Sequence, residues 1–185
     1  MRQILLALIL SITLACAMVS DARVVSTPST YAASELRDDA QRTTRSVSGT
    51  AVHFFSTAIV HSQTPTATGM IQRSTDIIEL SGDLTGRVLY HPTSVFDFVN
   101  GTLVNTGNQV FSGTVLGSAP VLLHDDEFRF EVDLKTGGLE SGEVHLSDRI
   151  TGPRIRCDLV AVGTGAKTAE GNSIVDYTGT CTFKK

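Results

Sequence analysis

The 185-residue sequence contains no tryptophan, and aromatic residues make up only 6% of it. Without tryptophan we do not expect a sugar-stacking site. Several catalytic and ligand motifs are also missing: the Gly-x-Ser-x-Gly of hydrolases, a glycine-rich phosphate loop, and the His-x-His, His-Glu-x-x-His and Cys-x-x-Cys spacings of metal or redox centres. These absences leave the chain without a recognisable catalytic signature, and we expect no cofactor and no metal.

Charge is sparse, and neither sign forms a long run. Lysine and arginine total 15 against 19 acidic residues, which gives a net charge of −4. Nucleic-acid binding needs a basic stripe, commonly with aromatic residues among the basic ones, and neither is present. The one locally basic segment, Arg154-Ile155-Arg156, is expected on the outer face of a strand. Nucleic acid is therefore not an expected partner.

The amino terminus carries the one long apolar run, residues 4 to 17, after a single basic residue. This pattern predicts a secretory signal peptide over residues 1–22, cleaved after Ala22, because the run is too short to favour a membrane span. Leu14-Ala15-Cys16 offers an alternative, since it resembles the end of a bacterial lipobox and would place a lipid on Cys16. That lipid would be the only membrane contact. Both alternatives predict an extracytoplasmic protein, either secreted or periplasmic.

Two further segments follow the signal peptide. Residues 23–46 are rich in small and polar side chains and predict a flexible linker. Residues 47–185 are dense in β-branched side chains, with turn-forming residues every eight to twelve positions and no sustained helical period, which predicts an all-β domain. Within it, a phrase of the form apolar-Ser/Thr-Gly-polar-apolar returns at near-regular spacing. Its central glycines are Gly49, Gly82, Gly113 and Gly179, with a weaker version at Gly142, where Glu140 takes the first apolar position.

Glycines in matching phase on several strands are typical of a sheet that bends sharply enough to close. We therefore predict a small closed antiparallel β-barrel of about eight strands. Asn100-Gly101 predicts a type I′ hairpin turn, and Pro92 predicts the end of a strand. Cys157 and Cys181 lie in the last two predicted strands and, in an oxidising compartment, are expected to form a disulfide.

Two groups of polar residues are candidates for catalysis. The segment 128–135 alternates aromatic or aliphatic residues with charged ones, so Glu131 and, on the next strand, His145 would share a charged face. That face is either the polar lining of a barrel or its solvated exterior. Tyr90 and His91 end a predicted strand, where His91 could be oriented by Asp97, or could simply be exposed. The run 124–127 is interpreted as a solvated acidic loop.

The phrases Ser81-Gly82-Asp83-Leu84-Thr85-Gly86 and Tyr177-Thr178-Gly179-Thr180 give residues 47–183 a resemblance to the allene oxide cyclase-like barrels and their secreted bacterial relatives. The resemblance implies a calycin-like eight-stranded barrel with an apolar interior, in which some members cyclise polyunsaturated or polyketide substrates by shaping them. No catalytic residue of that family can be matched to a position here.

Three hypotheses for function follow. The first is binding of a small apolar molecule in the barrel. The second is a cofactor-independent cyclase or isomerase that uses Tyr90, His91, Glu131 or His145, and the third is a structural or interaction protein with a filled barrel. The first predicts a cavity lined by phenylalanines, namely Phe96, Phe98, Phe111, Phe128 and Phe130.

Overall fold

The computed structural model describes residues 42–185, so the predicted signal peptide, the lipobox cysteine Cys16 and the linker up to residue 41 lie outside the described residues. The described part is all-β apart from one short 3-10 helix, and none of its helices is long and apolar enough to cross a bilayer. The first strand begins at Arg42, before the predicted boundary at Val47. The elements are β1 Arg42–His53, η1 Phe55–Thr57, β2 Ile59–Pro65, β3 Gly69–Gly82, β4 Leu84–Asp97, β5 Thr102–Val115, β6 Val121–Asp125, β7 Arg129–Asp133, β8 Gly138–Leu146, β9 Asp148–Thr151, β10 Arg154–Lys167 and β11 Ser173–Lys184.

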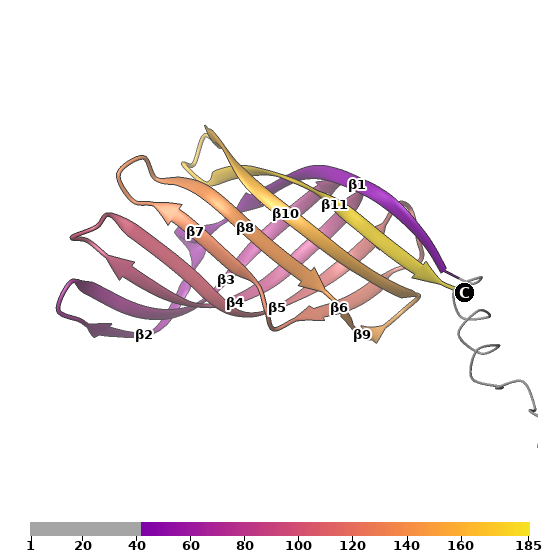
Figure 1. Cartoon of the computed structure of the whole chain (residues 1–185), viewed down its shortest axis with the longest axis horizontal. Coiled ribbons are helices and arrows are strands. Elements are labelled where there is room, and N and C mark those ends of the chain that lie inside the picture. Colours follow the sequence, from indigo (N-terminus) through magenta and orange to yellow (C-terminus); the bar gives the residue numbers. More distant parts are fainter. Residues whose placement is uncertain (1–41) are drawn as a thin grey trace, which may run out of the picture.

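The strands close into an antiparallel barrel of eight strand positions (Figure 1). Going round it, β1 pairs with β11, β11 with β10, β10 with β8, β8 with β7, β7 with β5, β5 with β4, β4 with β3, and β3 returns to β1. β6 pairs with the other half of β5 and with β9, so β6 and β7 share one position and β8 and β9 share the next. β2 lies outside the ring and pairs with β3 only. The predicted fold class is confirmed.

Strict alternation of side chains explains how the barrel divides inside from outside. Along β10, residues from Arg154 to Val162 are alternately exposed and buried, as a strand with one face on a core requires. One end of the interior is filled solid. Its most deeply buried side chains, all within 2% of complete burial, include Leu84, Phe111, Val115, Val121, Leu123, Phe128, Leu146, Cys157 and Cys181.

The recurring glycines lie where two backbones or a backbone and a ring come very close. Gly49 of β1 faces Gly82 of β3. A β-carbon at Gly49 would overlap the Tyr177 hydroxyl, which accepts a hydrogen bond from the Leu84 amide at 2.8 Å and lies 3.1 Å from the Ser81 carbonyl oxygen. Glycine at position 49 therefore lets the last strand bind the β3–β4 turn from inside the barrel.

A disulfide joins Cys157 and Cys181, which are paired directly across β10 and β11. Both cysteines are completely buried. The predicted disulfide is present, and it holds the register of the last two strands at the filled end of the barrel.

Two turn predictions differ in detail from the structure. The Asn100-Gly101 hairpin joins β4 to β5, but through a four-residue loop, 98–101, in which the Asp97 carboxylate accepts the Val99 and Asn100 amides. Pro92 does not end its strand, because β4 continues to Asp97. The β3–β4 ladder skips Pro92, which has no N–H to donate, and resumes in the same register.

Candidate ligand-binding cavity

The half of the interior away from the filled end contains a cavity of about 460 Å³. This volume falls in the range of roughly 300–1,000 Å³ typical of small-molecule sites. One side of the cavity comes from β7, β8, β10 and β11 and is mainly apolar. Its apolar side chains are Phe130, Val132, Leu139, Val144, Leu146, Leu159, Ala161 and Val175, and its polar ones are Lys167, Ser173 and Tyr177.

The opposite side, formed by β1, β3, β4 and β5, carries most of the polar groups of the cavity, among apolar side chains such as Ile78 and Val88. Asp76, Tyr90 and Gln109 face one another directly across β3, β4 and β5, so they form one row on the inner surface of the sheet. The sequence of each strand makes this possible because these residues occupy the same phase as its inward apolar ones, as Asp76 does with Ile78. The polar side chains of this wall are His53, Gln72, Ser74, Asp76, Tyr90, Ser94, Asn105 and Gln109.

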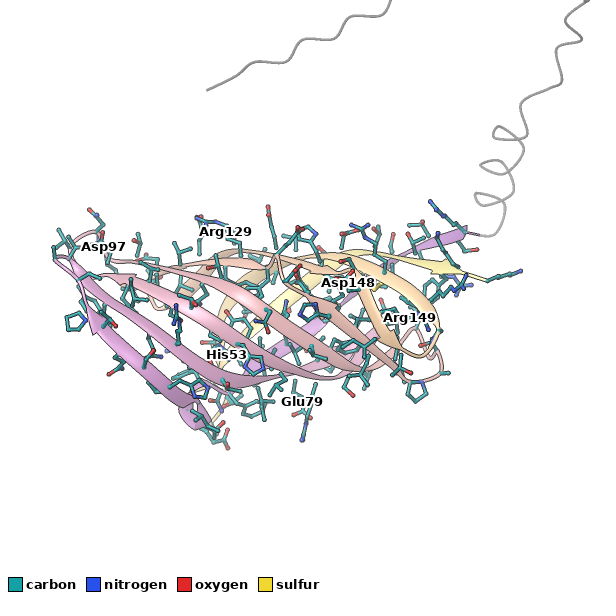
Figure 2. The ribbon with its side chains drawn as sticks, turned by 90° about the horizontal axis from the view of Figure 1, so that it is seen from below. His53, Glu79, Asp97, Arg129, Asp148 and Arg149 are labelled. Carbon is teal, nitrogen blue, oxygen red and sulfur yellow. A yellow bond between two sulfur atoms is a disulfide. The ribbon has the colours of Figure 1, made fainter. Side chains whose placement is uncertain are left out.

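His53 and Asp76 form a close contact between two ionisable side chains of the cavity wall. His53 Nε2 lies 3.0 Å from Asp76 Oδ2, with the carboxylate side chain only 6% exposed and the imidazole 27% exposed. Figure 2 shows His53 in the barrel interior, whereas Glu79 and Arg129 project from its outside. A buried carboxylate on one ring nitrogen fixes the orientation of the imidazole.

Tyr90 stands at the centre of the polar wall, where its ring packs edge-on against His53 with centroids 5.6 Å apart. Burial raises the pKa of the Tyr90 hydroxyl well above its ordinary value, the negative charge of Asp76 raises it further, and a hydrogen bond with Asn105 opposes the shift. The hydroxyl therefore stays neutral over the physiological pH range and remains able to donate a hydrogen bond.

Two buried oxygens of the polar wall have no hydrogen-bond partner, Asp76 Oδ1 and Asn105 Oδ1. Leaving a buried acceptor unsatisfied costs roughly 1–3 kcal/mol, so native proteins rarely do so without a reason. Both residues border the cavity.

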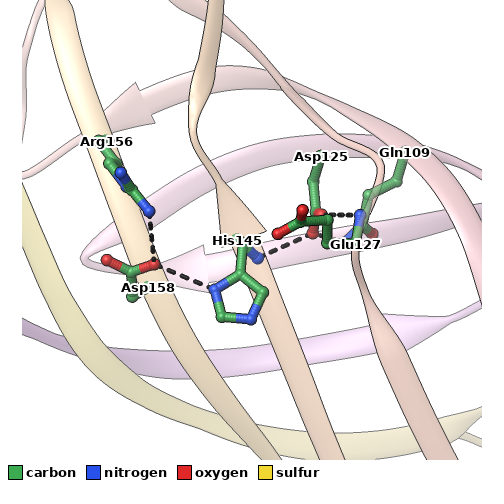
Figure 3. A network of polar contacts seen from close by, with 6 residues as sticks. All are labelled: Gln109, Asp125, Glu127, His145, Arg156 and Asp158. Atoms are coloured by element: carbon green, nitrogen blue, oxygen red, sulfur yellow. Dashed lines mark hydrogen bonds and ion pairs between the residues drawn. The ribbon is translucent and has the colours of Figure 1, made fainter.

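Asp125, at the far end of the same polar row, is fully satisfied (Figure 3). Its Oδ2 accepts hydrogen bonds from Gln109 Nε2 at 2.9 Å and from the His145 amide at 2.8 Å, and its Oδ1 accepts the Glu127 amide at 2.8 Å. It is 1% exposed, so the interpretation of 124–127 as a solvated loop is wrong at this residue. Through these hydrogen bonds Asp125 connects the segment between β6 and β7 to the neighbouring strands β5 and β8.

The mouth of the cavity lies between η1 and the turns that follow β7 and β10. Phe55 of η1 lines this rim and is 48% exposed. Ser56 Oγ donates a hydrogen bond of 3.0 Å to Oδ1 of the buried Asn172, which ties η1 to the β10–β11 loop. The rim is thereby held by groups more than a hundred residues apart in the chain.

Of the four residues predicted for catalysis, the structure places only Tyr90 in the cavity. His91 is on the outer face, where its Nδ1 lies 2.9 Å from Thr75 Oγ1, and Asp97 is six residues further along the same strand, about 20 Å away. Glu131 is also outside and pairs with Arg129 at 2.7 Å. His145 is outside too, beside Asp158 (Figure 3).

The five predicted phenylalanines divide between three places. Phe96 and Phe130 line the cavity. Phe111 and Phe128 were expected to line it as well, but they pack into the filled core at 0% and 1% exposure. Phe98 sits in the β4–β5 loop and is 61% exposed, so it lies outside the cavity wall.

Sequence reasoning missed His53, Asp76 and Asn105. A usable signal existed for His53, which continues the inward phase of Val47 and Ala51 along β1. A polar residue in the apolar phase of a strand indicates an inward polar group. Asp76 gives a weaker signal, because the neighbouring Ile77 and Ile78 make the phase of β3 ambiguous.

No protein-family model, curated protein or solved structure matches this chain. Among residues 42–185 there is also no group of three or more His, Cys, Asp or Glu side chains placed to hold a metal ion.

Proposed function

We propose that the barrel binds a small molecule with an apolar body and one hydrogen-bonding edge. The observation that carries this proposal is the cavity of about 460 Å³, whose lining is mainly apolar on β7, β8, β10 and β11 and carries most of its polar side chains on β1, β3, β4 and β5. A purely apolar ligand would leave the two unpartnered oxygens of the polar wall, Asp76 Oδ1 and Asn105 Oδ1, unsatisfied. The unpartnered oxygens of Asp76 and Asn105 favour a ligand that donates hydrogen bonds.

Two further proposals accompany this one. The buried disulfide supports a location outside the cytoplasm, where such bonds persist. The relationship to allene oxide cyclase-like barrels is supported by the closed eight-stranded fold and by the cavity inside it. The alternative of a filled barrel would need a solid interior, whereas the interior is solid at one end only.

A displacement assay tests the proposal directly. N-phenyl-1-naphthylamine, an apolar fluorophore with one N–H donor, would be bound first and then displaced by 1-dodecanol, dodecyl methyl ether or dodecane. We expect the alcohol to bind about five- to tenfold more tightly than the ether, since one net hydrogen bond is worth roughly 1 kcal/mol. Equal affinity for all three competitors, or no fluorophore binding, would contradict the proposal.

Two matched variants distinguish the contributions of the polar wall and the apolar wall to binding. Asn105→Leu removes an amide from the polar wall at nearly constant volume, and we expect it to reduce the preference for the alcohol. Val144→Thr introduces a hydroxyl of the same shape into the apolar wall, and we expect it to weaken all three competitors without changing their order. If either variant changed both the preference for the alcohol and the affinity for all three competitors, the result would not support a two-sided site.

A second function, proton transfer, is favoured by the His53–Asp76 pair. An imidazole oriented by a buried carboxylate can remove a proton from one carbon of a bound molecule and return it to another, which isomerises the molecule without a cofactor. In D₂O this reaction would leave deuterium in the released ligand. Deuterium uptake that persists in His53→Ala would rule out this role, and loss of uptake with retained binding would establish it.

A further inference from the structure

A second concave surface lies on the outside of the barrel at the end opposite the cavity. It is a groove of about 550 Å³, lined by five basic residues and a single carboxylate: Arg42, Arg149, Arg154, Arg156, Lys184 and Asp158. β1 runs from Arg42 at this groove to His53 at the cavity, so the two sites are separated by about 35 Å of strand. Figure 1 shows the beginning of β1 and the end of β11 together at that end of the barrel.

The strand register places three of these cations in one row. Arg42 of β1 is directly opposite Lys184 of β11, and Lys184 is directly opposite Arg154 of β10. Side chains in such positions have β-carbons about 4.5–5.5 Å apart, and like charges there are destabilising. A chain with a net charge of −4 thus gathers positive charge at one place against its overall balance.

The groove also offers neutral donors beside its cations. Ser147 and Thr182 contribute hydroxyls to its lining. Asp158 is its only carboxylate among the described residues, and it is already engaged by His145 Nδ1 at 3.1 Å and by Arg156 Nη2 at 3.7 Å (Figure 3). Several guanidinium groups next to hydroxyls match the oxygens of phosphate groups.

We propose that this groove binds an anionic ligand through its phosphate groups. The cations come from β1, β9, β10 and β11, so the site exists only in the closed barrel, and residues 154–156 are the single part of it that is visible as a basic segment in the sequence. The proposal is independent of what the cavity binds.

The test is isothermal titration calorimetry of the full chain with inorganic pyrophosphate. It is carried out at about 50 mM and at about 300 mM NaCl. The double variant Arg154→Gln/Arg156→Gln removes two cations of the groove. The control Arg87→Gln/Arg129→Gln removes two exposed cations elsewhere, each located beside a glutamate. We expect the groove variant to bind pyrophosphate at least about tenfold more weakly than the wild type. Raising the salt concentration should weaken binding to the wild type by at least about tenfold as well. The control variant should lose less than about twofold in affinity.

Vesicles of phosphatidylcholine with and without phosphatidylglycerol distinguish the source of the phosphate. Binding of pyrophosphate alone indicates a free phosphorylated ligand, and binding of the phosphatidylglycerol vesicles alone indicates a lipid headgroup. The proposal is overturned if neither binds, if citrate binds as tightly as pyrophosphate, or if the control variant loses as much affinity as the groove variant. Lys184→Gln, at the end of the last strand, provides a second groove variant if the double variant fails to fold.

Discussion

His53 Nε2 and Asp76 Oδ2 are 3.0 Å apart inside the barrel, and the other oxygen of Asp76 has no partner. Asp125, on the same row of inward residues, has hydrogen bonds to both of its oxygens. One buried carboxylate is therefore completed by the fold, and the other is left incomplete beside a cavity. We interpret Asp125 as a structural group and Asp76 as part of the binding site.

Asparagine substitutions test this distinction. Asp125→Asn should lower the free energy of unfolding by about 3 kcal/mol, because it weakens three hydrogen bonds to a buried anion. Asp76→Asn should cost no more than about 1–2 kcal/mol, since a single bond to His53 is affected. Urea unfolding of both variants measures the difference. Equal losses would contradict the assignment of roles.

His145 should make stability depend on pH. A hydrogen bond to Asp158 raises the pKa of His145 above its ordinary value, with further contributions from the charges of Asp125, Asp158 and Glu127 against the opposing effect of burial. A raised pKa in the folded state means that the stabilisation is complete below the unfolded pKa of about 6.5 and is lost as pH rises through the folded value.

The comparison of the wild type with His145→Gln isolates this effect from the other histidines. The wild type should be more stable than the variant at pH 5.5, by less than about 1 kcal/mol because the pair is partly exposed. The difference should shrink toward pH 9. If the stability difference between the wild type and His145→Gln instead grew with pH, the predicted direction of the pH dependence would be wrong.

The disulfide should contribute strongly to stability. Cys157 and Cys181 are 24 residues apart, and closing a loop of that length is worth about 3 kcal/mol in the chain-entropy model. Cys157→Ala/Cys181→Ala should lower the free energy of unfolding by that amount, and dithiothreitol should destabilise the wild type but leave the double variant unchanged. Insensitivity of the wild type to complete reduction would contradict this.

Gly142 should control the shape of the cavity through Phe130. A β-carbon at position 142 would overlap the Phe130 ring, which lines the cavity. Gly142→Ala should therefore displace that ring and weaken N-phenyl-1-naphthylamine binding several-fold, with a stability cost of about 1–3 kcal/mol. Gly138→Ala, on the same strand but with only an ordinary contact to Thr136, is the matched control and should bind the fluorophore normally.

The sequence was sufficient for the class of fold because its signals are local. The alternation in segment 128–135 predicts which side chains of β7 point inward, and the glycine phrases predict a sheet that closes. The disulfide followed from the same strand assignment. The sequence could not decide whether Tyr90 or the adjacent His91 faces the interior of the barrel. In the structure it is Tyr90.

The rest of the site depends on register, which no local pattern reports. His53 reaches Asp76 because β1 returns to pair with β3, with His53 opposite Ile78. In the same way, Arg42 and Lys184 are at opposite ends of the described chain and meet across β1 and β11. Both sites are assembled from strands whose pairing follows from closing the barrel.

The most direct test of the central claim is native mass spectrometry of the full-length protein isolated from its own source without detergent. We predict one non-covalent adduct per chain, released on denaturation, that is composed mainly of carbon and hydrogen and carries one or two hydrogen-bonding groups. The protein stripped of this adduct should take up one molecule of 1-dodecanol. A ligand-free mass in every preparation, together with no uptake of 1-dodecanol, would contradict the claim that the barrel is a binding site.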